Sequence, residues 1–134
     1  MAAYRARVLV LDDENYRIEL IRELLEPAEI VGATDCAAFL TLAREGSWSL
    51  LCLDHDLGGG LQAPTSLPAV EAIARPEGEL FRSLCHVPVL VHSLNLHAAS
   101  SIVAALWAWE APVLRLPFHL LGEYASLLRE LADV

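Results

Sequence analysis

A short apolar strand that ends in aspartates limits what this chain can fold into. Leu50–Leu53 is a run of four apolar residues, which is typical of a strand buried on both faces. Asp54, His55 and Asp56 follow at once, and a glycine run over 58–60 comes next. Carboxylates at the end of a buried strand need a metal ion, hydrogen bonds or solvent. The end of this strand is therefore a candidate functional site, unless the aspartates only cap the next turn.

Four further apolar runs alternate with segments of helical periodicity. Strands are expected at Arg7–Leu11, Ile30–Ala33, Val87–Val91 and Val113–Arg115. Short strands that alternate with helices predict an α/β fold with a doubly wound, five-stranded parallel sheet. The 134 residues are enough for one domain over residues 1–134.

The net charge restricts the partners that we expect. Nine basic and eighteen acidic residues give a formal charge of -9, which repels polyanions over most of the surface. We therefore expect no binding of extended nucleic acid. A small phosphorylated ligand, or the phosphorylated end of a nucleic acid, is compatible because a metal ion and local donors act at short range.

The cysteines and the chain start indicate a reduced, cytoplasmic protein. Cys36, Cys52 and Cys85 are odd in number and have apolar neighbours, and they show neither a CxxC motif nor a Cys/His spacing typical of zinc sites. The residues after Met1 lead into a strand and not into a long apolar span, so we expect no membrane insertion.

Polar residues follow almost every expected strand. Because the carboxyl ends of parallel strands meet at one edge of a sheet, we expect these side chains to lie close together. The residues concerned are Asp12, Asp13, Asp54, His55, Asp56, His92, Ser93, Asn95 and Arg115.

The residue types in this group indicate phosphate chemistry with a divalent ion. Asp12, Asp13 and Asp54 offer the hard oxygen ligands that Mg²⁺, or Mn²⁺, prefers. Asp56 is expected to act as a ligand or as a general acid/base, with a loop cap as its alternative. Glu14 is more readily explained as a first-turn helix acid than as a ligand.

Two histidines and three further polar residues complete the expected site. His55 and His92 are expected to move protons near neutral pH, although strand alternation could turn His55 away from the acids. Ser93, Asn95 and Arg115 are expected to bind phosphate oxygens, and Asn95 could instead cap the following helix.

The motifs at the strand ends resemble those of the receiver domains of response regulators. The resemblance implies a sheet of strand order 2-1-3-4-5, Mg²⁺ held by the acids, phosphorylation of Asp54 and a phosphate contact from Ser93. It rests on Asp12-Asp13, Asp54 with Leu57-Gly58, Ser93 and Pro117-Phe118. The lysine that receivers carry directly before Pro-Phe is replaced here by Leu116, with Arg115 one residue earlier.

Three segments resemble more closely a divergent receiver-like group that has been proposed to process cyclic phosphates. They are Leu11-Asp12-Asp13-Glu14, Asp54-His55-Asp56-Leu57-Gly58 and His92-Ser93-Leu94-Asn95. This resemblance implies Mg²⁺-dependent binding or hydrolysis of a phosphoester such as a cyclic phosphate. The alternatives are a stand-alone receiver phosphorylated on Asp54 and an inactive receiver-fold interaction module.

One expected helix, His97–Trp109, carries no charged residue. Its large apolar residues are spread around its axis, so half of its apolar surface is expected to have no core to enter. They are Ile102, Val103, Leu106, Trp107 and Trp109. Exposed apolar area of this kind commonly marks a protein contact. We therefore expect a homodimer through this helix, unless the alanines occupy its outer face.

Overall fold

Five parallel strands form one sheet in the order β2-β1-β3-β4-β5. The computed structural model describes residues 5–57 and 64–134, so the glycine run over 58–60 lies outside the described residues. The strands are β1 (Arg7–Leu11), β2 (Glu29–Ala33), β3 (Leu50–Leu53), β4 (Val89–Val91) and β5 (Val113–Arg115). The expected fold class and strand order are confirmed, while β4 begins two residues later than the sequence pattern indicates.

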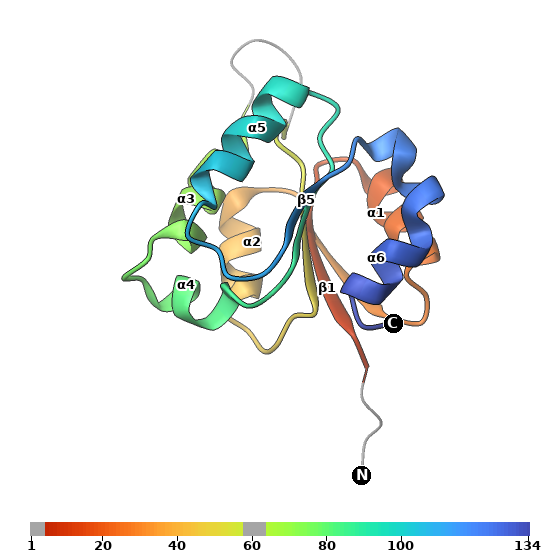
Figure 1. Cartoon of the computed structure of the whole chain (residues 1–134), viewed down its shortest axis with the longest axis horizontal. Helices are drawn as coiled ribbons and strands as arrows, with labels where there is room; N and C mark the ends of the chain where they lie inside the picture. The colour runs from red at the N-terminus through yellow and green to blue at the C-terminus, as the bar shows by residue number, and fades with distance from the viewer. Residues whose placement is uncertain (1–4, 58–63) are drawn as a thin grey trace.

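Helices cover both faces of this sheet (Figure 1). One layer contains α2 (Cys36–Ala43), α3 (Leu67–Ala74), α4 (Glu79–Leu84) and α5 (Leu96–Ala105). The other contains α1 (Asn15–Leu24) and α6 (Ala125–Leu131). A 3₁₀ helix, η1 (Phe118–Tyr124), precedes α6.

Alternation along the strands divides the core in two. Leu51 and Leu53 of β3 face the layer of α2 to α5, whereas Leu50 and Cys52 face α1 and α6. All four residues of β3 are buried, as expected for the central strand of a sheet covered on both faces. Hydrophobic packing on both faces therefore fixes where β3 ends, and with it the position of Asp54.

The helix α5 is shorter and better buried than the sequence predicted. It ends at Ala105, and Ile102, Leu106 and Trp109 enter the core that α5 shares with α3 and the sheet. Trp107 alone among the large side chains at this end is strongly exposed, with 81% of its surface accessible. The expectation that half of this segment's apolar surface lacks a core is corrected accordingly.

The helices of the described ranges are short. None of them combines the length and the apolar character that a crossing of the lipid bilayer requires.

Candidate functional site

Three carboxylates meet at the carboxyl edge of the sheet. Asp12 and Asp13 follow β1, and Asp54 follows β3, whose Leu53 is paired with Leu11 of β1. Ligand atoms of the three aspartates lie within 4.8 Å of one another. Asp12 and Asp54 are buried and Asp13 is partly exposed. This oxygen-only set, close enough to share one ion, fits a hard divalent cation such as Mg²⁺.

A pocket of about 300 Å³ opens beside the carboxylates. Arg17 is the only basic side chain among the residues that line it. The lining residues are Asp13, Glu14, Arg17, Asp54, Asp56, Ser93 and Leu94. The pocket is therefore acidic with a single guanidinium group.

Arg17 reaches the carboxylates from the first turn of α1. Its Nη1 donates a hydrogen bond to Oδ2 of Asp54 over 3.1 Å and lies 3.6 Å from Oδ1 of Asp12. Its Nε donates to the Tyr16 hydroxyl over 3.2 Å. The guanidinium carbon also lies 5.6 Å from the ring centroid of Phe118, a cation–π distance. The side chain is therefore held from several directions and points at Asp54.

Arg17 was not expected at the site, because the apolar residues of α1, among them Ile18 and Ile21, put it among the polar positions of the helix. The available signal was its position in the first turn of a helix that starts directly after Asp12 and Asp13. Such a residue lies above the carboxyl edge of the sheet, where a long side chain can turn back toward the acids. Leu116, which stands where receivers carry lysine, packs instead against the core under α1 and α6.

His92 lies beneath Asp12 and not in the pocket. Both residues have no exposed surface, and Nε2 of His92 donates a hydrogen bond to Oδ2 of Asp12 over 2.9 Å. The other carboxylate oxygen, Oδ1, accepts the backbone N–H of Glu14 over 2.9 Å. Direct contact between His92 and a ligand was expected, but burial of the ring prevents it in this geometry. The contact fits a residue that orients Asp12.

Asp56 and His55 form a pair at the rim. Nδ1 of His55 and Oδ1 of Asp56 are 2.6 Å apart, and Asp56 lines the pocket while His55 does not. The backbone N–H of His55 also donates to Oδ1 of Asp54 over 3.0 Å. His55 can therefore act on a pocket ligand only through Asp56.

The three expected phosphate-binding residues differ in their placement. Ser93 lines the pocket, and its hydroxyl accepts the backbone N–H of Asn95 over 3.2 Å. Asn95 caps α5, because its Oδ1 accepts the N–H of Ala98 over 3.1 Å, which was the alternative considered from sequence. Arg115 points elsewhere: its Nη1 donates to the Ser100 hydroxyl of α5 over 2.5 Å, so it is not a pocket residue. Of the three, only Ser93 lines the pocket.

Burial gives Asp54 an unusual proton affinity. It raises the pKa of Asp54 from 3.8 to about 6, and the nearby Asp12 carboxylate acts in the same direction. His92, Arg17 and the N–H of His55 oppose this rise without cancelling it. A cation bound among the carboxylates would favour the ionised form.

The sequence of this chain matches one defined family of receiver domains. Residues 7–108 match the family described as the cyclic-phosphate processing receiver domain. The chain belongs to this family. A comparison with curated proteins found no match to it.

Solved structures of receiver proteins share the fold of this cyclic-phosphate processing receiver domain. The response regulator TrrA of Thermotoga maritima, in complex with Mg²⁺-BeF, is 23% identical with a TM-score of 0.67, over 94% of this chain and 98% of that one. A receiver protein of Pseudomonas putida is 19% identical with a TM-score of 0.67, over 96% and 99%. The Vibrio cholerae chemotaxis protein CheY4 is 17% identical with a TM-score of 0.65, over 94% and 98%.

Proposed function

We propose that this receiver domain hydrolyses a phosphoester with the help of Mg²⁺ or Mn²⁺, and that the substrate is a cyclic phosphate. The observation that carries the proposal is the combination in one pocket of carboxylates close enough to share an ion with a guanidinium group directed at Asp54. Carboxylates suit the metal and the guanidinium suits the phosphate. The family to which the chain belongs supports the choice of substrate class.

The charge of the pocket supports a requirement for metal. Asp13, Glu14, Asp54 and Asp56 line it against the single Arg17, so a phosphate entering alone would meet net repulsion. Asp12, Asp13 and Asp54 would hold the ion, with the backbone N–H of Glu14 and the His92 ring keeping Asp12 in place. Bound there, a divalent ion supplies charge neutralisation and Lewis acidity toward a phosphoryl oxygen.

Arg17 is proposed to bind the phosphate. The guanidinium has donors left after its bonds to Asp54 and Tyr16, and it borders the pocket. A planar fork of donors matches two phosphoryl oxygens, and its fixed charge stabilises the negative charge that develops during displacement at phosphorus. The Ser93 hydroxyl, which follows the carboxyl end of β4, provides a second hydrogen bond.

Asp56 is proposed to transfer the proton of the attacking water, with His55 as its partner. Asp56 takes a proton from the attacking water as its oxygen bonds to phosphorus, and the His55 ring steadies the carboxylate through the 2.6 Å contact. The ester P–O bond then breaks, and the departing oxygen receives the proton from Asp56. A cyclic phosphate opens in this way to a monoester with a free hydroxyl, and the enzyme returns to its starting state.

A turnover screen tests the proposal. Cyclic nucleotides with five-membered and six-membered phosphate rings, a linear phosphodiester and a monoester are incubated with the protein and Mg²⁺, and the products are resolved by chromatography. We expect ring opening by the wild type, loss in Asp54→Asn and Arg17→Gln, and full activity in Arg115→Gln, whose side chain contacts Ser100 outside the pocket.

An alternative outcome would assign the pocket to signalling. If no phosphoester turns over while acetyl phosphate labels Asp54 stably, the hydrolase proposal fails and the domain acts as a phosphorylated receiver. Mass spectrometry of the intact chain and of Asp54→Asn distinguishes the two results.

A further inference from the structure

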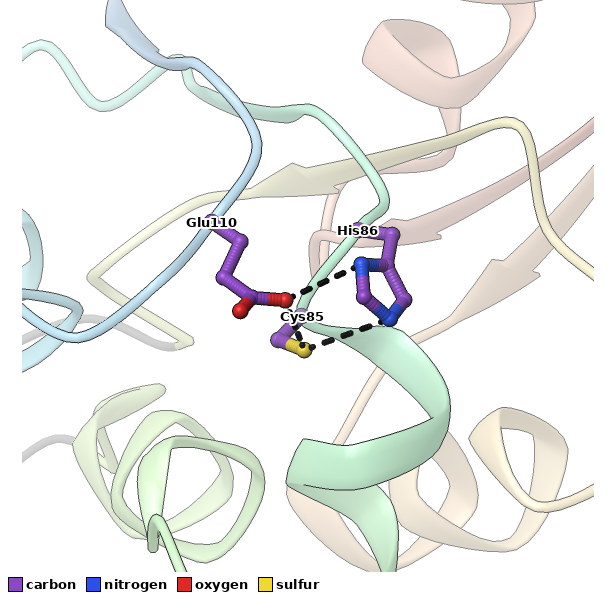
Figure 2. A group of neighbouring side chains, drawn as sticks. All are labelled: Cys85, His86 and Glu110. Atoms are coloured by element: carbon purple, nitrogen blue, oxygen red, sulfur yellow. Dashed lines mark hydrogen bonds and ion pairs between the residues drawn. The ribbon is translucent and has the colours of Figure 1, made fainter.

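A second cluster of metal-binding side chains lies at the opposite edge of the sheet. Cys85 follows α4, His86 is next in the chain, and Glu110 precedes β5 (Figure 2). These segments lead into the amino ends of β4 and β5, whereas the aspartate cluster follows the carboxyl ends of β1 and β3. In a parallel sheet the two clusters are therefore separated by the length of the strands.

The three side chains already contact one another. The Cys85 thiol donates a hydrogen bond to Oε2 of Glu110 over 3.1 Å, and Nδ1 of His86 lies 3.0 Å from the same oxygen. The Cys85 sulfur lies 3.8 Å from Nε2 of His86. Figure 2 shows the carboxylate, the thiol and the imidazole ring turned toward one another.

The backbone that carries the cluster is fixed on both sides. The carbonyl of Cys85 accepts the N–H groups of both Glu110 and Ala111, each over 3.0 Å. One residue away from the cluster in each segment, the indole N–H of Trp109 donates to the carbonyl of Val87 over 2.7 Å within the core. These bonds tie the end of α4 to the segment before β5, so the side chains meet without any rearrangement of the main chain.

We propose that Cys85, His86 and Glu110 bind one Zn²⁺ ion. Zinc takes thiolate, imidazole and carboxylate ligands, with bond lengths of about 2.3 Å to sulfur and about 2.0–2.1 Å to nitrogen or oxygen. Tetrahedral coordination at those lengths puts neighbouring ligand atoms about 3.3–3.6 Å apart. The Glu110 Oε2 atom lies 3.1 Å from the Cys85 sulfur and 3.0 Å from Nδ1 of His86, close to these values, and one ligand atom from each of the three side chains lies within 4.8 Å of the other two. Water would take the fourth position.

The three ligands differ in how far they are exposed to solvent. Cys85 is buried, whereas the side chains of His86 and Glu110 are 71% and 59% exposed. The two exposed side chains can adjust by small rotations about a fixed sulfur, and the ion can enter from solvent. The residue types exclude Mg²⁺ as the preferred ion, because a thiolate is a soft ligand.

The Cys85 thiol has to lose its proton when zinc binds, because the thiolate is the form that coordinates a metal ion. Burial and the adjacent Glu110 carboxylate raise the pKa of Cys85, so the thiol is protonated in the absence of the ion. Zinc can nevertheless replace the thiol proton: the S–H bond breaks, the proton leaves to solvent and the sulfur–zinc bond forms. The ion would then connect the end of α4 to the segment before β5 in place of the hydrogen bond from Cys85 to Glu110.

Cobalt substitution tests the site directly. Tag-free protein is reduced, stripped of metal and titrated with Co²⁺, which fits tetrahedral zinc sites and gives a thiolate-to-cobalt charge-transfer band in the near ultraviolet. We expect one equivalent of Co²⁺ to produce the band and Zn²⁺ to bleach it. Cys85→Ser should abolish the band and Glu110→Gln should weaken binding at least tenfold, whereas Cys36→Ser should leave it unchanged. The absence of a band in the wild type, or its survival in Cys85→Ser, would overturn the proposal.

Thermal unfolding provides a second readout that does not require a cysteine variant. A ligand that binds only the folded state raises Tm with its concentration. We expect Zn²⁺ to raise Tm in the wild type and in Asp13→Ala, and to lose this effect in Glu110→Gln and His86→Gln, both of which change exposed side chains and leave the fold intact. An equal Zn²⁺ effect in wild type and Glu110→Gln would exclude this cluster as the zinc site.

Discussion

Arg17 and Asp54, 37 residues apart in the sequence, are joined by a hydrogen-bonded ion pair of 3.1 Å at the carboxyl edge of the sheet. The Arg17 guanidinium therefore neutralises the same carboxylate that a divalent ion would bind, and the two cations would compete for Asp54. The pair also links α1 to the end of β3, so metal binding at the aspartates would change a contact of α1.

Replacing Arg17 by glutamine should separate metal binding from turnover. The Arg17 guanidinium competes with the metal for Asp54, and an ion pair of this kind contributes about 1 kcal/mol. Its removal should therefore raise the affinity for Mg²⁺ about fivefold. Turnover should fall at least a hundredfold, because the phosphate loses its guanidinium contact. Calorimetry and initial rates measure the two effects, with Arg115→Gln as the control. Parallel losses in both quantities would indicate instead that Arg17 only maintains the fold of the pocket.

Asp54 should make the metal-free protein pH-sensitive. Its folded-state pKa of about 6 lies above the ordinary 3.8, so folding favours the protonated carboxyl. The resulting stabilisation is complete below about pH 4 and is lost as the pH rises through about 6, a change of up to about 3 kcal/mol in the free energy of unfolding. Asp54→Asn should remove this dependence. Urea unfolding in EDTA at several pH values measures it, and parallel curves for the two proteins would contradict it.

Binding of Mg²⁺ should require both Asp13 and Asp54. We expect Asp13→Ala and Asp54→Ala each to abolish the binding heat, since each removes one of three hard ligands within 4.8 Å. Glu45→Ala, which removes an exposed acid elsewhere, is the matched control for charge. Binding that persists unchanged in both aspartate variants would place the ion elsewhere.

His92 should act through Asp12. In His92→Gln we expect Mg²⁺ affinity to fall about tenfold to a hundredfold, as is typical when a group that orients a metal ligand is lost. The shape of the pH–rate profile should stay the same, because the buried ring does not carry the catalytic proton. Disappearance of one limb of that profile, with unchanged metal affinity, would show that His92 transfers protons.

We further propose that two copies of the chain associate through the outer face of α5. Leu96, Ser100 and Ala104 share that face at helical spacing, and the strongly exposed Trp107 follows directly after the helix. Trp107→Glu should convert a dimer to a monomer in light scattering. A wild type that is monomeric at micromolar concentration would reject the proposal.

The architecture was predictable because it depends on patterns that are local in sequence. The apolar runs of β1 and β3 and the acids that end them identify the strands and the edge at which Asp12 and Asp54 meet. The match of residues 7–108 to the family confirms the resemblance drawn from those motifs.

What could not be predicted depends on side-chain direction. Arg17 is on a helix whose facing was read from its apolar residues alone, and its long side chain bends from the polar face to Asp54. Arg115 ends β5 as expected, yet its guanidinium turns to Ser100. His92 follows the expected strand, and only the packing of the sheet shows that it is covered.

The cysteine cluster illustrates a separate limit. Zinc motifs are recognised by short spacings between ligands, and Glu110 lies 25 residues after Cys85 with strand β4 and helix α5 between them. The parallel pairing of β4 with β5 brings the two segments together. Only the sheet topology reveals such a combination.

The ion pair of Arg17 bears on the order of folding and metal binding. A buried acid cluster that relied on magnesium for neutrality would tie folding to the supply of the ion. Here the guanidinium serves as an internal counter-ion, so the chain can reach its native state before any metal arrives. Under the proposed function, metal binding would then be a reversible step after folding, and the concentration of free ion would set the fraction of active protein.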